Sequence, residues 1–171
     1  GLFTKLTTDI VLESQEFTGE VWFKTTSSMP MVIFSDNDAS GSWGHSLYID
    51  GGTLGFDFTV DGGTIIRLDT SEVITDGDWH NVAVVRGLNH VEIWLDGELS
   101  AQRQYDGDVD FSSSYVYVGQ NPLGGELFSG NIDDLKFSNI PRHKEDLISG
   151  VGVVEFNSLV NDEDGLIIEY E

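Results

Sequence analysis

The sequence predicts an all-β fold, an antiparallel sandwich or jelly roll, and three observations support this prediction. Apolar and polar residues alternate with a period of two in several short runs. The 171-residue chain contains 20 glycines and only three prolines, and several glycines follow an aspartate between these runs. The runs make about a dozen short strands at roughly ten-residue spacing, which is typical of sandwiches and jelly rolls. A chain of this length is expected to form a single domain, over residues 1–171.

The alternation shows which face of each predicted strand points inward. Three strands carry only apolar residues on one face: Leu54, Phe56, Phe58 and Val60; Val91, Ile93 and Leu95; and Val116 and Val118. The run 81–86 is apolar on both faces, which suits a central strand covered on both sides. Aspartate–glycine pairs mark tight turns between strands, because glycine readily adopts a positive φ. These turns are expected at Asp50-Gly51, Asp61-Gly62, Asp76-Gly77 and Asp96-Gly97.

One polar residue falls on a predicted inward face. Asp133 shares its parity with Leu135 and Phe137, whereas Asp134 shares the opposite face with Lys136. We therefore expect a buried carboxylate at Asp133. Such a group requires hydrogen bonds or a cation, and backbone amides are the simplest source.

The charge balance excludes some partners and favours others. Thirty Asp and Glu residues against eight Lys and Arg residues give a formal net charge of −22. Such a surface repels phosphate backbones and anionic lipid headgroups, so we expect no nucleic-acid partner. No apolar run approaches the ~18 residues of a membrane helix, so we expect no membrane insertion. A surface with this negative charge attracts cations. The alternative is that the negative charge serves only to keep the protein soluble.

Five segments in a fixed order carry a resemblance to a known family. They are 17–24 (FTGEVWFK), 77–86 (GDWHNVAVVR), 91–97 (VEIWLDG), 115–120 (YVYVGQ) and 128–137 (FSGNIDDLKF). Together they resemble a laminin G-like domain of the concanavalin A-like jelly-roll superfamily. The resemblance implies two curved antiparallel sheets of about six or seven strands each. It also implies a binding module of a secreted or cell-surface protein, for glycans or protein partners and often with calcium.

Two further features of the sequence bear on the origin of the chain and on its extent. Animal laminin G-like domains usually close their C-terminal end with a disulfide, but this chain has no cysteine, which suggests a bacterial relative. The chain begins with Gly1 rather than with methionine, so we expect it to be part of a larger multidomain chain.

The sharpest local motif is a candidate calcium loop. The segment 36–41 (DNDASG) matches the first half of an EF-hand loop, in which oxygens at positions one, three and five converge before a glycine. We therefore predict calcium as the cofactor, with Asp36, Asp38 and Ser40 as ligands. The glutamate of position twelve is replaced by Leu47, so further ligands must come from another loop, such as the one at Asn121. The alternative is an acidic turn that binds no metal.

Six residues are candidate ligand contacts, because flat aromatic rings and polar loop side chains suit sugar binding. Trp43, His45 and Asn121 form a predicted rim group in loops beside the calcium turn; Tyr48, Trp94 and Tyr117 form a predicted sheet group on outward strand faces. Trp22 also lies on an outward face. The rim is favoured, because loop side chains are freer to meet a ligand. The alternative is that loops fold over these rings and form a second small core.

No complete catalytic constellation is present. The glycosidase signature of this fold, E-x-D-x-x-E, is absent, and the four histidines lack the spacing of a zinc site. We therefore predict a non-catalytic carbohydrate-binding or adhesion module, extracellular or at the cell surface, whose partner is a glycan or a cell-surface glycoprotein. The first alternative is a protein-interaction or spacer module in a large adhesin. The second is a glycoside hydrolase or polysaccharide lyase domain.

Overall fold

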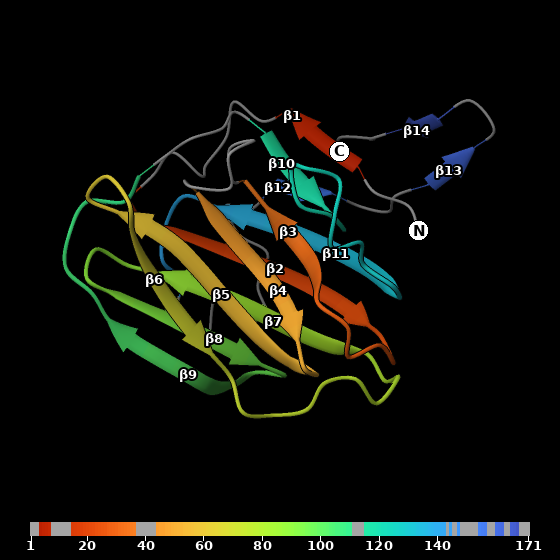
Figure 1. The fold of residues 1–171 in the computed structure, drawn as a ribbon, viewed down its shortest axis with the longest axis horizontal. Helices are drawn as coiled ribbons and strands as arrows, with labels where there is room; N and C mark the ends of the chain where they lie inside the picture. The colour runs from red at the N-terminus through yellow and green to blue at the C-terminus, as the bar shows by residue number, and fades with distance from the viewer. Residues whose placement is uncertain are drawn as a thin grey trace.

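The computed structural model describes residues 4–7, 15–36, 44–110, 115–142, 144, 147, 154–156, 160–162 and 165–167. Within this part of the chain the regular structure consists of β-strands without a helix (Figure 1). Accordingly, no helix in it is long and apolar enough to cross a membrane. The strands form two six-stranded antiparallel sheets and one separate hairpin.

Both sheets combine strands that lie far apart in the sequence. In spatial order, sheet I consists of β1 (Thr4–Thr7), β10 (Tyr115–Val118), β3 (Met31–Ser35), β4 (His45–Asp50), β5 (Thr53–Val60) and β6 (Thr64–Asp69). Sheet II consists of β12 (Val154–Phe156), β11 (Asn131–Ser138), β2 (Phe17–Lys24), β7 (His80–Arg86), β8 (His90–Leu95) and β9 (Glu98–Gln104). The hairpin pairs β13 (Val160–Asp162) with β14 (Gly165–Ile167).

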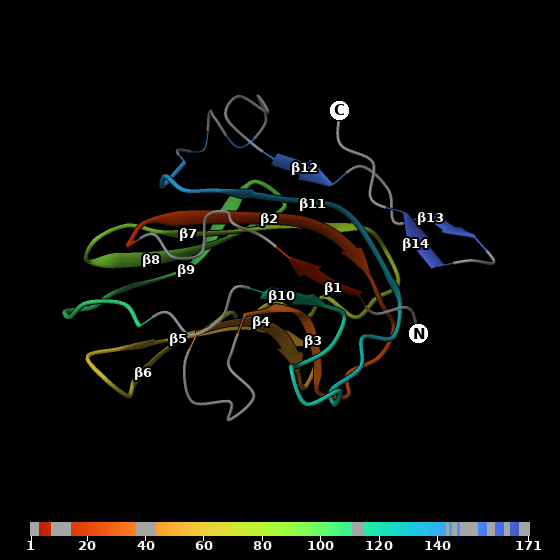
Figure 2. The ribbon, with the colours of Figure 1, turned by 90° about the horizontal axis from the view of Figure 1, so that it is seen from above.

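The two sheets lie face to face and enclose the hydrophobic core (Figure 2). The apolar faces that the alternation identified on β5, β8 and β10 are all buried in this core. Sheet II contributes Phe17, Val21 and Phe23 from β2. The Phe17 ring contacts Phe56 of sheet I, and the Phe23 ring contacts His80 of sheet II and Phe128. The predicted antiparallel jelly-roll sandwich of two sheets is therefore confirmed.

Strand β7 is buried on both faces, as its sequence predicts. It lies in the interior of sheet II between β2 and β8. Val82 and Val84 belong to the core between the sheets, while Ala83 and Val85 are buried on the outer face. Polar groups cover part of this outer face, because the buried Arg142 donates from Nη1 to Glu20 Oε1 of β2 at 2.6 Å.

Three of the four predicted turns join paired neighbouring strands, whereas Asp76-Gly77 lies in the longer connection between β6 of sheet I and β7 of sheet II. Asp96 and Gly97 have φ angles of 50° and 79° and join β8 to β9 as a two-residue hairpin. The Asp96 carboxylate also accepts hydrogen bonds from the backbone N–H of Asn81 and from the His80 ring, both at 2.8 Å. The aspartate therefore connects this hairpin to the start of β7.

The expectation of a buried carboxylate at Asp133 is wrong. A β-bulge lies between Asp133 and Lys136, where Asp134 has a positive φ of 51°. The extra residue reverses the in–out parity, so Leu135 and Phe137 are buried while Asp133 is exposed and pairs with Trp22. Strict counting by twos cannot detect such an insertion.

Candidate functional site

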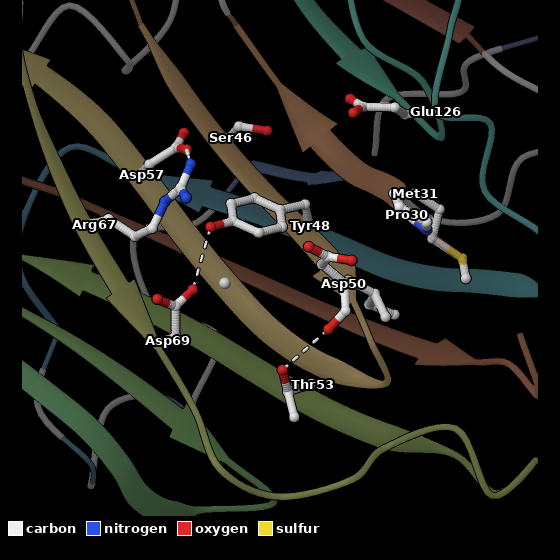
Figure 3. Close-up of a pocket in the computed structure, with 12 residues that line it drawn as sticks. Pro30, Met31, Ser46, Tyr48, Asp50, Thr53, Asp57, Arg67, Asp69 and Glu126 are labelled. Atoms are coloured by element: carbon white, nitrogen blue, oxygen red, sulfur yellow. Dashed lines mark hydrogen bonds and ion pairs between the residues drawn. The ribbon is translucent and has the colours of Figure 1, made fainter. Parts of the chain in front are cut away.

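A hollow of about 490 Å³ opens on the outer face of sheet I (Figure 3). Its walls come mainly from β4, β5 and β6, whose outward side chains include Tyr48, Asp57, Arg67 and Asp69. The loop that precedes β11 adds Glu126, whose carbonyl oxygen accepts the backbone N–H of Val32 at 2.8 Å. The hollow is therefore lined largely by polar side chains held on paired strands.

Tyr48 forms a flat aromatic surface in this hollow. It pairs directly with Gly55 of β5, and its ring lies across that glycine. A Cβ atom at Gly55 would lie only 2.3 Å from Cζ of the ring, so a side chain at this position would displace the ring. The phenol hydroxyl donates a hydrogen bond to Asp69 Oδ1 at 3.2 Å, which orients the ring along the sheet (Figure 3).

A single arginine faces several carboxylates around the ring. Arg67 Nη2 donates to Asp57 Oδ2 at 3.1 Å, and its guanidinium carbon lies 5.6 Å from the centre of the Tyr48 ring. Among the described residues that line the hollow, Arg67 is accompanied by the carboxylates of Asp50, Asp57, Asp69 and Glu126. The hollow therefore has a negative formal charge.

This environment changes the acidity of two lining residues. Burial raises the pKa of the Tyr48 hydroxyl, and the nearby Asp57 and Asp69 carboxylates raise it further. Burial also raises the pKa of Asp57, although Arg67 opposes this effect. At neutral pH the Tyr48 hydroxyl therefore stays neutral and remains a hydrogen-bond donor.

Tyr117 shares the outer face of sheet I with the hollow. It pairs with Ser35 of β3, which pairs with Ser46 of β4, which in turn pairs with Asp57 of β5. Directly opposed residues of a sheet point to the same side, so Tyr117 and the lining residue Ser46 face the same way. The half-buried Tyr117 thus extends this face beyond the hollow.

Asn121 organises the loop at the border of the hollow. Its Oδ1 accepts the backbone N–H groups of Leu123 and Gly125 at 3.1 and 2.9 Å. Its Nδ2 donates to Glu126 Oε2 at 3.1 Å, and Glu126 lines the hollow. Asn121 therefore holds the lining carboxylate in place.

The predicted sheet group is not one group. Tyr48 and Tyr117 lie on sheet I, whereas Trp94 lies on β8 of sheet II, where it pairs with Ala83 on the outer face. The Trp94 indole donates from Nε1 to Glu92 Oε2 at 2.8 Å, and the Lys144 ammonium lies 5.7 Å from its ring. Trp94 is separated from the hollow by the whole sandwich.

His45 does not lie in a loop, and this part of the predicted rim is wrong. It is the first residue of β4, and its side chain is completely buried. The ring packs between Phe17, Phe56 and Phe58 in the core. A side chain enclosed in this way cannot touch a ligand at the surface, so His45 is not part of the candidate site.

His45 instead joins two charged groups in the core. Its Nδ1 lies 2.9 Å from both carboxylate oxygens of Asp36, and its Nε2 accepts a hydrogen bond from Arg86. Burial lowers the pKa of His45, so the ring is neutral, with its proton on Nδ1 toward Asp36. We call Asp36, His45 and Arg86 the core network.

The position of Asp36 bears on the predicted calcium site. Its side chain is buried, and its carboxylate also accepts the backbone N–H of His45. A carboxylate engaged in this way does not fit the role of an exposed calcium ligand. The other predicted ligands, Asp38 and Ser40, lie outside the described residues, as does Trp43. Within the described residues no group of three His, Cys, Asp or Glu side chains could hold a metal ion.

Sequence reasoning missed most of the charged lining of the hollow. Asp57 lies between the buried Phe56 and Phe58, so the alternation on β5 placed its carboxylate on the outer face. Arg67 and Asp69 follow the same alternation on β6. The available signal was a set of outward charges on three neighbouring strands. The sequence alone does not show that these charges lie close together, because that depends on which strands pair.

The architecture and this site can be compared with known proteins. The model of a family described as the concanavalin A-like lectin/glucanases superfamily, Laminin G type, matches residues 4–147. The chain is a laminin G-like member of this superfamily. Laminin G-like domains are generally non-catalytic binding modules, in a superfamily that also includes enzymes. A search of curated proteins finds no match to the sequence.

Solved structures with this fold have low sequence identity to the laminin G-like chain. Domains LG4-5 of the mouse laminin alpha1 chain match with a TM-score of 0.68 and 15% identity, over 90% of this chain and 43% of that one. The LG1-3 region of the laminin alpha2 chain matches with a TM-score of 0.66 and 17% identity, over 93% of this chain and 34% of that one. The binding domain of botulinum neurotoxin serotype G matches with a TM-score of 0.67 and 15% identity, over 86% of this chain and 39% of that one. This chain therefore spans less than half the length of each of these structures.

Proposed function

We propose that this laminin G-like chain is a non-catalytic carbohydrate-binding module and that the hollow at Tyr48 holds the sugar. The observation that carries the proposal is the Tyr48 ring, which lies flat across Gly55 within a polar hollow. An aromatic ring supplies an apolar surface for the C–H face of a sugar, and polar groups around it set the orientation.

The polar lining suits a ligand with many hydroxyl groups. A sugar hydroxyl both donates and accepts hydrogen bonds, so it needs donors and acceptors in one site. Arg67 offers guanidinium donors beside the ring, while Asp57 and Asp69 offer carboxylate acceptors on either side of it. These groups stand on paired strands, so they are held in place before the ligand arrives.

The charge of the hollow narrows the class of sugar. Four lining carboxylates face one guanidinium, and the whole chain has a formal charge of −22. Sulfated, sialylated and phosphorylated glycans would bring further negative charge to this face and would be repelled. We therefore propose a neutral sugar or an amino sugar as the ligand.

We also propose that the module works outside the cell as part of a longer chain and binds a glycan or a cell-surface glycoprotein. Laminin G-like domains typically occur in extracellular proteins, which supports this setting. The competing role is that of a protein-interaction or spacer module, in which no sugar binds. A glycan array separates the two roles, because only the first gives bound glycans.

The Tyr48 ring is tested by truncation. On a neutral glycan that the array returns, we expect Tyr48→Ala to weaken binding about tenfold to a hundredfold, because the ring surface against the sugar is lost. Tyr48→Phe should retain most of the affinity, since it keeps the ring and loses only the hydroxyl. Isothermal titration calorimetry measures both dissociation constants.

Ile65→Ala provides the matched control for this experiment. Ile65 lies on β6, is exposed, and does not line the hollow, so its variant should bind like the unmodified protein. Equal affinities for Tyr48→Ala and Ile65→Ala would contradict the proposed site. An array that returns no neutral glycan would contradict the proposed function itself.

Calcium binding is tested through Asp38, because Asp36 belongs to the core network. If calcium binds only the folded chain, a hundredfold excess over its dissociation constant adds about 2.7 kcal/mol of stability. We expect the melting temperature to rise in calcium and to fall with chelator, and Asp38→Ala to abolish this response. Differential scanning fluorimetry measures it.

Magnesium at the same concentration is the control for ionic strength. A calcium response that persists in Asp38→Ala would exclude the turn at 36–41 as the binding site. Asp36→Ala is unsuitable for this purpose, because it also removes a carboxylate that contacts His45 in the core.

A further inference from the structure

A second hollow lies on the opposite sheet, away from Tyr48. It has a volume of about 540 Å³ and is lined by Trp22, Trp79, Asp133 and Asp134. Both tryptophans are exposed, Trp22 to 40% and Trp79 to 43%. Indole rings are mostly buried in proteins, so two exposed rings in one hollow require an explanation.

Strand pairing places the two indoles next to each other. Trp22 pairs with Asn81 of β7, and Trp79 immediately precedes that strand, two residues from Asn81. The two tryptophans are therefore diagonal neighbours on the outer face of β2 and β7, within reach of one another's rings. Both indoles line the same hollow.

The β-bulge of β11 brings carboxylates to the edge of this surface. Asp133 pairs with Trp22 because the bulge turns it outward, and it accepts the backbone N–H of Asp134 at 2.9 Å. Asp134 Oδ2 accepts a hydrogen bond from Lys136 Nζ at 2.8 Å. Acceptor groups thus stand beside the indoles.

The charges around the indoles balance. The Lys24 ammonium lies 5.2 Å from the centre of the Trp79 ring, and Lys136 pairs with Asp134. Two lysines therefore accompany two carboxylates, in contrast to the acidic hollow at Tyr48. A ligand for this surface needs no charge of its own.

We infer that the surface formed by Trp22, Trp79, Asp133 and Asp134 is a second binding site, and that it takes a neutral oligosaccharide chain. The two adjacent indoles offer apolar area to successive sugar rings, and the carboxylates and ammonium groups bond to hydroxyls. The inference does not rest on the proposed function, because it concerns a different sheet.

Intrinsic fluorescence reports on this site directly. We expect a panel of neutral hexasaccharides (cellohexaose, xylohexaose, mannohexaose and chitohexaose) to include one that shifts the tryptophan emission to shorter wavelength in a saturable way. Isothermal titration calorimetry, whose signal does not depend on the replaced indoles, should show that Trp22→Ala and Trp79→Ala each weaken that binding at least tenfold and that the double variant abolishes it. Circular dichroism and the melting temperature should stay close to those of the unmodified protein, because both side chains are exposed.

Two controls separate this site from the others. Trp94→Phe removes an outward indole of the same sheet that lies outside the hollow, and it should retain the affinity. Tyr48→Ala should also retain it, so a loss confined to Tyr48→Ala would place all sugar binding on sheet I. The inference is overturned if no hexasaccharide shifts the emission, or if the double variant binds as before. It is also overturned if tetramethylammonium shifts the emission and no sugar does, because the site then takes cations.

Discussion

Replacing Arg86 by methionine is expected to lower the free energy of unfolding by about 3–5 kcal/mol, because it leaves a buried carboxylate without its countercharge. Arg86 is completely buried and donates a hydrogen bond to His45, which contacts Asp36. Burial lowers the pKa of Arg86 to about 10, so the guanidinium is still charged at neutral pH. Its carbon also lies 4.8 Å from the centre of the Phe17 ring. Urea denaturation followed by tryptophan fluorescence measures the change.

Arg67→Met is the matched control, since it removes the same group from the surface. The Arg67 side chain is 57% exposed, and its ion pair with Asp57 is accessible to water. Exposed pairs of this kind contribute about 0–1 kcal/mol, so the control should remain near the unmodified protein. A similar small effect for Arg86→Met would contradict the view that the core network holds a paired buried charge.

The second large effect is expected at Gly130, just before β11. Its φ is 154°, and a Cβ atom there would lie 2.1 Å from the carbonyl oxygen of Lys24. A backbone oxygen paired in a sheet cannot rotate away as a side chain can. We expect Gly130→Ala to lower the free energy of unfolding by about 2–5 kcal/mol, the sum of backbone strain and overpacking.

Gly124→Ala separates these two contributions. Gly124 also has a positive φ, 75°, but no atom lies within 4 Å of an added Cβ. Its alanine variant therefore reports only the conformational penalty, about 1 kcal/mol. Equal losses for the two variants in urea denaturation would show that the contact with Lys24 has no role.

Much of the fold could be predicted from local patterns. The period-two alternation on β5 and β8 identifies the inward residues, because successive side chains of a strand point to opposite faces. The Asp96–Gly97 turn follows from the positive φ angles that a two-residue hairpin requires. The five ordered segments identified the laminin G-like family, which the family match over residues 4–147 shows.

The candidate sites could be predicted only in part. Alternation correctly placed Tyr48, Tyr117 and Trp22 outward, but it could not say which sheet each residue belongs to. Trp94 is also outward, yet it lies across the sandwich from Tyr48, because sheet membership depends on pairing between distant strands. Sequence proximity was equally misleading for His45, which lies near the predicted calcium turn but enters the core at the start of β4.

Local sequence thus determined the strands, most of their turns and, apart from Asp133, their inward faces, since each depends on the steric preferences of a few neighbouring residues. The tertiary structure alone decided the partners of those strands, and with them both hollows. It set the ring of Tyr48 on Gly55, which is seven residues away, and Asp133 beside Trp22, which is more than a hundred residues away. The bulge that turns Asp133 outward arises in the pairing of β11 with β2, and a backbone insertion of this kind leaves no trace in the hydrophobic alternation of one strand.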